Sequence, residues 1–173
     1  MSAMDELTED VEHHATNGFD RRVAVTMAII AAALAIVSVL GHLAVTEELL
    51  NQQRASDQWS FYQAKSMRRY TAEVARDLAG TLKSGQLVEK YAADAGRYEK
   101  EGEEIQQKAK EFQIESDREG RRAVRLHLGE VFLEIAIVFA SLAILTKHSA
   151  LWGTAIVSAI VGVAVAATAM FIK

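Results

Sequence analysis

Long uncharged stretches alternate with a highly charged one along the chain. Val23–Thr46 and Ser149–Ile172 contain no formal charge, and Leu128–Thr146 contains only Glu130 and Glu134. A helix needs roughly 20 apolar residues to cross a hydrocarbon core about 30 Å thick. The pattern therefore predicts three transmembrane helices, at 23–46, 128–146 and 149–172.

A cleaved signal peptide is the alternative for the first stretch. Against it, residues 1–22 are acidic except for Arg21 and Arg22, and the apolar run exceeds the usual signal-peptide core. We therefore expect a retained transmembrane helix, preceded by an acidic and disordered N-terminal tail.

Basic residues near the ends of the predicted helices indicate their orientation. The larger number adjoins the segment between the first and second helices, and Lys173 adds one at the C-terminus. This favours a cytoplasmic central segment and C-terminus in a bacterial inner membrane. One basic cluster before the second helix suits anionic lipid headgroups; its members are Arg118, Arg121, Arg122 and Arg125.

The central segment, residues 47–127, is polar and contains no proline. Its apolar residues recur at spacings of three and four, which is typical of a coiled-coil seam. Gly80 and Gly85 indicate a turn at 80–85 between two helical arms. The predicted fold class is thus an all-α membrane protein with a long antiparallel helical hairpin, similar to a coiled coil, inserted between the first and second transmembrane helices. A charged, partly disordered loop is the alternative.

A turn centred on Leu82 and Lys83 places large residues opposite small ones across this hairpin, as interdigitated packing requires. It sets Tyr70 opposite Ala95, for example. The residues predicted to pack inside the hairpin are Trp59, Tyr62, Met67, Tyr70, Val74, Leu78, Leu87, Tyr91, Tyr98, Ile105 and Phe112.

Composition and motifs limit the classes of function that the sequence predicts. The net charge is −4 and the mean hydropathy is +0.06, values that arise because apolar and charged blocks cancel. The chain has no cysteine, which excludes disulfides and thiolate nucleophiles. It also lacks a phosphate-binding glycine loop, an HExxH motif and a GxSxG motif. We predict no enzymatic activity, cofactor or bound metal, and the balanced charges of the central segment argue against nucleic acid as a partner.

Polar residues in the second transmembrane helix form the sharpest candidate site. His127, Glu130 and Glu134 are spaced i, i+3 and i+7, so they share one helix face. His42 ends the first transmembrane helix at the same membrane surface. Because an ionised carboxylate is costly inside a membrane unless paired or hydrated, these four residues form a candidate proton or cation site. A structural role for the acids and a divalent metal site with the histidines are the alternatives.

The third transmembrane helix carries a face of small residues. Ser158, Gly162 and Ala166 repeat every fourth position, which favours close helix contact. We therefore expect a homo-oligomer in membrane lipids, with an unknown protein as a further candidate partner. The predicted function is a non-enzymatic, self-assembling structural or interaction module. The alternative is an oligomeric ion or proton channel or transporter that uses Glu130 and Glu134.

Several segments also resemble a known family. Residues 55–69 read ASDQWSFYQAKSMRR, residues 146–152 read TKHSALW, and residues 98–111 are rich in Glu and Lys. These features resemble an uncharacterised bacterial integral membrane protein family, catalogued only as a domain of unknown function. The resemblance covers most of the chain, and it implies this membrane layout without implying any catalytic residue.

Overall fold

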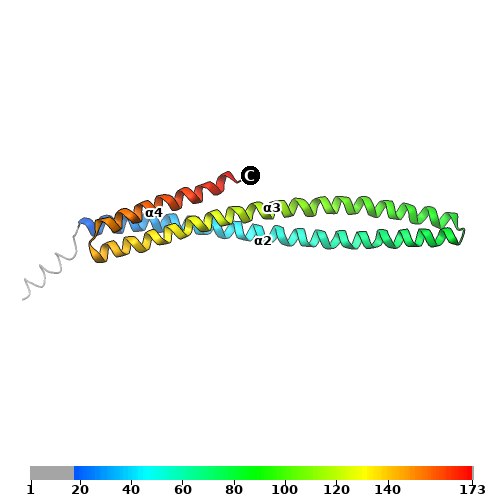
Figure 1. Ribbon diagram of the computed structural model, residues 1–173, viewed down its shortest axis with the longest axis horizontal. Helices are drawn as coiled ribbons and strands as arrows, with labels where there is room; N and C mark the ends of the chain where they lie inside the picture. Colours follow the sequence, from blue (N-terminus) through cyan, green and yellow to red (C-terminus); the bar gives the residue numbers. More distant parts are fainter. Residues whose placement is uncertain (1–17, 173) are drawn as a thin grey trace, which may run out of the picture. The chain divides into compact units, whose positions relative to one another are not determined.

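Helices make up the described part of the chain. The computed structural model describes residues 18–172, which contain no strand. Helix α2 runs from Gly18 to Thr81, α3 from Gly85 to Thr146 and α4 from Ser149 to Thr168 (Figure 1). A 3-10 helix, η1, follows at Ala169–Phe171. Most of the predicted acidic tail, residues 1–17, lies outside the described residues, as does Lys173.

Each of the three α-helices is long and apolar enough to cross a membrane. The prediction of an all-α protein with three such helices is therefore confirmed for residues 18–172. A helix suits this environment because it satisfies its own backbone hydrogen bonds where no water can do so. The chain accordingly has the helices of an integral membrane protein.

The chain divides into two compact units. The first, which we call the membrane unit, comprises the described residues up to Ala44 together with those from Arg121 onward. The second, the polar unit, comprises Val45–Gly120. Each unit contains a part of α2 and a part of α3.

The core of the membrane unit consists mainly of small side chains. Ala140, Ala143 and Ala155 are fully buried around Val23. Gly129 of α3 and Gly162 of α4 meet where these two helices cross, and a Cβ atom on Gly129 would lie 2.7 Å from the carbonyl oxygen of Gly162. The backbones of α3 and α4 are therefore in direct contact at this point.

The small-residue face of α4 is consequently used inside the chain. The Ser158 hydroxyl donates a hydrogen bond to the carbonyl of Phe132 on α3, at 2.7 Å. Gly162 and Ala166 pack against Gly129. The sequence predicts close helix contact for this face but also a contribution to oligomer contacts. The contact within the chain is thus observed, and a contribution of this face to oligomer contacts stays a prediction.

The start of α2 is tied to the turn between α3 and α4. Lys147, in the left-handed conformation with φ 59°, forms an ion pair with Asp20. The indole of Trp152 stacks edge-on against Phe19, with ring centroids 6.0 Å apart. Its N–H donates to the hydroxyl of Thr26 at 3.3 Å. Trp152 of α4 thus packs against the start of α2 inside the membrane unit.

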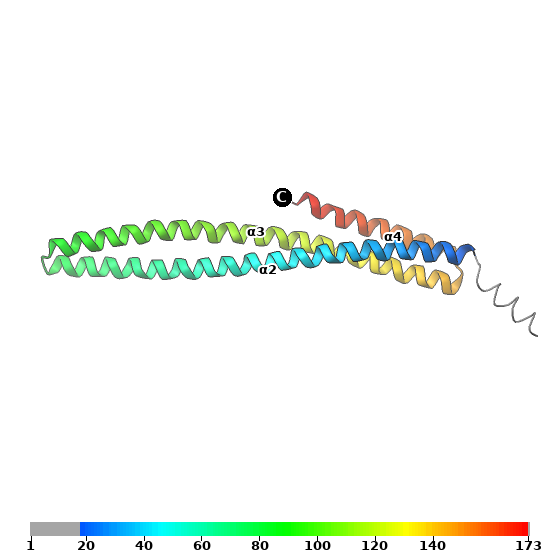
Figure 2. The same cartoon turned by 180° about the vertical axis from the view of Figure 1, so that it is seen from behind.

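Two helical arms of the polar unit lie side by side in both views (Figures 1 and 2). The chain reverses at Lys83, whose φ of 56° is left-handed. The N–H of Ser84 donates to the carbonyl of Ala79, and that of Lys83 donates to Gly80. This pair of bonds is a Schellman motif, which satisfies carbonyls left free at the end of α2.

Small residues also form the inner seam of the polar unit. On α2 the buried hydrophobic residues are Ala55, Ala72 and Ala79, and on α3 they are Ala95 and Ala109. Gly102, buried between these two, receives the ring of Tyr62 at 3.8 Å from the position of a Cβ atom. Side chains this small let two helices approach closely, and they leave room for only a few rings.

The predicted inner face of α2 is corrected by the structure. Met67, Tyr70, Val74 and Leu78 point outward, with exposed fractions of 54–68%. From α2, the residue that meets the Tyr98 ring is Lys65, whose ammonium lies 5.5 Å from its centroid. The long stem of a lysine can cover a seam of small residues while its charge stays in water, whereas the larger apolar side chains do not fit between the arms.

The α3 side of the seam contains the ring-bearing and branched residues that the sequence places there. Trp59 on α2 is half-buried and stacks edge-on against Tyr62, with centroids 5.7 Å apart. Leu87, by contrast, is 41% exposed. Four of the five packing residues that the sequence predicts on α3 are half-buried: Tyr91, Tyr98, Ile105 and Phe112.

The crossing of α3 and α4 gives a direct stability prediction. Gly129→Ala or Gly162→Ala should destabilise the detergent-solubilised protein by about 1–3 kcal/mol, because the added methyl group meets a backbone carbonyl that cannot move freely. Gly153→Ala is the matched control on α4, since a Cβ atom there meets nothing within 4 Å. Thermal unfolding followed by circular dichroism measures the difference, and equal melting temperatures for all three variants would contradict it.

Candidate functional sites

An uncharged stripe follows the outer face of α2 in the polar unit. Its members recur at spacings of three and four residues, so they stay on one side of a helix with 3.6 residues per turn. All are exposed, and none carries a formal charge. We call this set the outer stripe; it comprises Leu49, Gln53, Ser56, Ser60, Gln63, Met67, Thr71, Val74, Leu78 and Thr81.

Three of the four hydroxyl groups in the outer stripe are already hydrogen-bonded within α2. Ser60 donates to the carbonyl of Ser56, Thr71 to that of Met67, and Thr81 to that of Leu78. A hydroxyl bonded in this way can be covered without leaving a buried donor unsatisfied. The stripe can therefore be buried against another surface at low polar cost.

Ion pairs connect the two arms of the polar unit beside the inner seam. Lys65 donates a hydrogen bond to Glu101, and Arg69 reaches Glu99 at 3.1 Å. The hydrogen bond from Lys65 holds the pKa of Glu101 below its ordinary value. Charged residues thus occupy places where the sequence predicts apolar packing.

Buried polar groups gather at one end of the polar unit. The Ser116 hydroxyl donates to the carbonyl of Glu48 at 3.0 Å, while Asn51 and Glu119 are 7% and 3% exposed. Gly120 lets the Glu48 carboxylate approach the helix, because a Cβ atom there would lie 2.7 Å from Glu48 Oε1. The sequence did not predict this cluster, because its members are polar and resemble surface residues. One signal was available: Asn51 follows Ala44 by seven residues, so the two share one face of α2, and both are buried.

Three of the four predicted proton or cation residues lie together in the membrane unit. His127 Nδ1 is 3.0 Å from a carboxylate oxygen of Glu130. The rings of His42 and His127 meet edge-on with centroids 6.4 Å apart, which places α2 beside α3 at this point. Glu130 is thus paired with a histidine of its own helix, and a proton or cation role for these residues stays a prediction.

Glu134 is separate from this cluster. It is exposed and has no hydrogen bond or ion pair with any residue in the range 18–172. Because Glu134 follows His127 by seven residues and Ser141 follows it by seven, the three share one face of α3. This face presents an unpaired carboxyl group within a helix apolar enough to span a membrane.

The four arginines before the second transmembrane stretch are not alike. Arg118 lies 3.7 Å from Glu119 in the polar unit. In the membrane unit Arg121 and Arg125 are exposed and Arg122 is half-buried. Binding of these residues to lipid headgroups stays a prediction.

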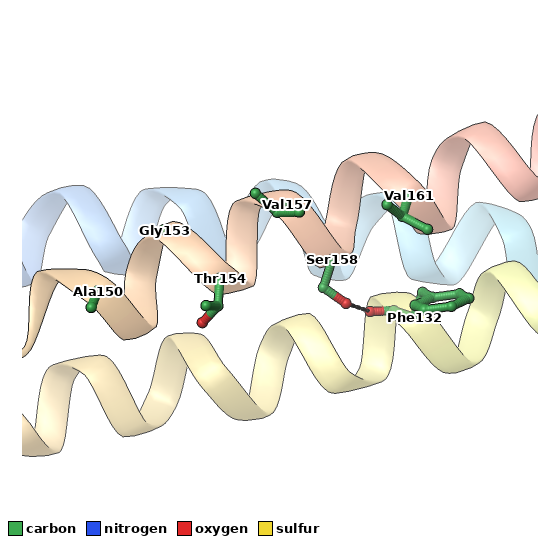
Figure 3. A pocket seen from close by; sticks show the side chains of 7 residues that line it. All are labelled: Phe132, Ala150, Gly153, Thr154, Val157, Ser158 and Val161. Carbon is green, nitrogen blue, oxygen red and sulfur yellow. Dashed lines mark hydrogen bonds between the residues drawn. The ribbon is translucent and has the colours of Figure 1, made fainter.

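A shallow apolar groove of about 550 Å³ lies along α3 and α4 in the membrane unit. Figure 3 shows Ser158 reaching from α4 to Phe132 at one side of it. The residues that line it are Phe132, Ala150, Gly153, Thr154, Val157, Ser158 and Val161. Within residues 18–172, no group of three His, Asp or Glu side chains is placed to hold a metal ion.

Comparison with known protein families gives a match over nearly all of the chain. The model of one family, described as domain of unknown function DUF4337, matches residues 19–172. The chain belongs to the DUF4337 family. No curated protein and no solved structure matches it.

Proposed function

We propose that this DUF4337 protein is a non-enzymatic integral membrane protein that self-assembles and serves as a membrane-anchored structural or interaction module. The observation that carries the proposal is the outer stripe. Its apolar members Met67, Val74 and Leu78 are 60–68% exposed in the polar unit. In this proposal water and not lipid surrounds these three residues, because they lie in the polar segment 47–127 between two apolar stretches.

Burial of the outer stripe supplies the driving force in this proposal. Removing one large aliphatic side chain from water contributes about 1.5–3 kcal/mol. Continuous apolar patches exposed to water mark interaction surfaces in soluble parts of proteins. A helical hairpin that resembles a coiled coil, with one seam inside and the outer stripe outside, is suited to bundle with other hairpins.

The proposal also specifies the membrane and the orientation of the protein in it. The polar unit and the C-terminus face the cytoplasm, and the membrane is a bacterial inner membrane. The basic cluster from Arg118 to Arg125 then contacts anionic headgroups, which attract arginines at a membrane surface. Supporting this orientation is the excess of basic residues next to the polar segment.

Substituting the apolar part of the outer stripe tests self-assembly. The wild-type protein in detergent should have a protein mass that is a multiple of 19.0 kDa. The triple variant Met67→Ser, Val74→Ser, Leu78→Ser should return to a single chain, because the buried apolar area is lost. Light scattering coupled to size exclusion measures the protein mass.

Ile114→Ser is the matched control, since Ile114 is 67% exposed on α3 and lies outside the outer stripe. This variant should assemble like the wild type. A wild-type protein that is monomeric at every concentration would reject self-assembly.

A second candidate function is an oligomeric proton or cation channel. The unpaired Glu134 favours it, because an exposed carboxyl group in a membrane span is costly unless it faces water, a second copy or another polar group. Copies arranged around an axis would turn the face containing His127, Glu134 and Ser141 toward a shared path.

Ion flux in reconstituted vesicles tests this candidate. If Glu134 conducts, Glu134→Gln should remove the flux, whereas Glu134→Asp should retain a measurable part of it because the carboxyl group is kept. No flux above that of empty vesicles for the wild type would eliminate the channel.

A further inference from the structure

We propose that a second copy of this chain binds the outer stripe with its own outer stripe, parallel and in register. The proposal rests on the self-assembly proposed above and specifies its interface. It makes α2 a helix with two seams: an inner seam for its own α3, and an outer seam for the α2 of the second copy.

The charge distribution selects the second copy as the occupant. From Leu49 to Thr81 the outer stripe contains no acid or base, although the polar unit around it is dense in both. Two identical charged faces would oppose like charges across a two-fold axis, whereas two outer stripes meet without repulsion. The bonded hydroxyls of Ser60 and Thr71 also allow burial against an identical surface.

The polarity along the stripe selects a parallel arrangement. After Leu49, its first half contains only Gln53, Ser56, Ser60 and Gln63, whereas its second half is mainly apolar from Met67 onward. An antiparallel pair would bury apolar residues against amides and hydroxyls. A parallel pair matches like with like, and it is also the arrangement available to two copies inserted in the membrane in the same orientation.

Gln63 selects the register. Its side-chain amide has no hydrogen-bond partner among the described residues. Across a two-fold axis two Gln63 amides each donate one hydrogen bond and accept one, in the way that a single buried polar residue defines register in coiled coils. A shift by one helical turn would instead place Gln63 against Met67 and leave both amides unsatisfied.

Disulfide cross-linking in membranes tests the interface, and the chain is suited to it because it contains no native cysteine. Single substitutions Ser60→Cys, Met67→Cys and Val74→Cys should each give a disulfide-linked dimer on mild oxidation, since facing core positions of a parallel pair meet the distance requirement of a disulfide. Arg68→Cys, the exposed neighbour of Met67, is the matched control, and Gln107→Cys on α3 is a second one. We expect at least tenfold faster dimer formation at the stripe positions than at either control.

Three outcomes would overturn this interface. The first is an equal rate of dimer formation for Met67→Cys and Arg68→Cys. The second is faster dimer formation for Gln107→Cys than for the stripe positions. The third is a disulfide that forms only when Gln53→Cys and Leu78→Cys chains are mixed, which would indicate an antiparallel pair. If the protein mass shows an oligomer but the stripe does not cross-link, this inference fails while self-assembly stands. If the protein mass shows a monomer, both fail. Circular dichroism of each variant verifies that the helices are intact.

Discussion

Small side chains at the helix contacts are the constraint on which the rest of this structure depends. Thirteen of the eighteen buried hydrophobic residues between positions 18 and 172 are alanines. In the membrane unit, Gly129 and Gly162 bring α3 and α4 into backbone contact. Contacts made from small residues gain stability from close van der Waals packing of the helices. They leave little room for large side chains, and many of these therefore point outward in both units.

Outward-facing apolar residues have different consequences in the two units. In the membrane unit, Ile29, Val138 and Ile160 are 56–65% exposed, and lipid is their natural environment. In the polar unit, Met67 and Val74 are exposed to the same degree, but water surrounds them unless another protein surface covers them. Seams of small residues therefore leave apolar side chains exposed in both units, where lipid covers those of the membrane unit and nothing among the described residues covers those of the polar unit. This is the physical basis of the self-assembly that we propose.

The sequence predicts the helices well because length and charge determine them. The uncharged stretches and the glycines near the turn suffice for the three helices and for the reversal between Thr81 and Gly85. The inner face of α2 in the polar unit, by contrast, is predicted wrongly. The prediction assumed that Met67 and Val74 pack inside because they are apolar, whereas alanines form the seam and Lys65 lies beside it. Hydrophobicity alone does not distinguish two opposite faces of one helix when both follow spacings of three and four.

The candidate sites show the same limit of sequence patterns. Helical spacing places His127, Glu130 and Glu134 on one side of α3, but it does not separate Glu130, which bonds to His127, from Glu134, which has no partner within residues 18–172. Glu130 is half-buried beside His127, whereas Glu134 is exposed. Buried Asn51, Ser116 and Glu119 are invisible to patterns that search for apolar residues.

Intramolecular cross-linking within the polar unit tests the small-residue seam most directly. Ala55 and Ala109 are both buried, and each lies one heptad from the neighbouring contacts of Tyr62 with Gly102 and of Glu48 with Ser116. The double variant Ala55→Cys, Ala109→Cys should form a disulfide within one chain, detected as a mobility shift that a reductant reverses. The pair Ser56→Cys, Ala109→Cys should not, because Ser56 belongs to the outer stripe. Cross-linking of the Ser56 pair without that of the Ala55 pair would contradict a seam built from small residues.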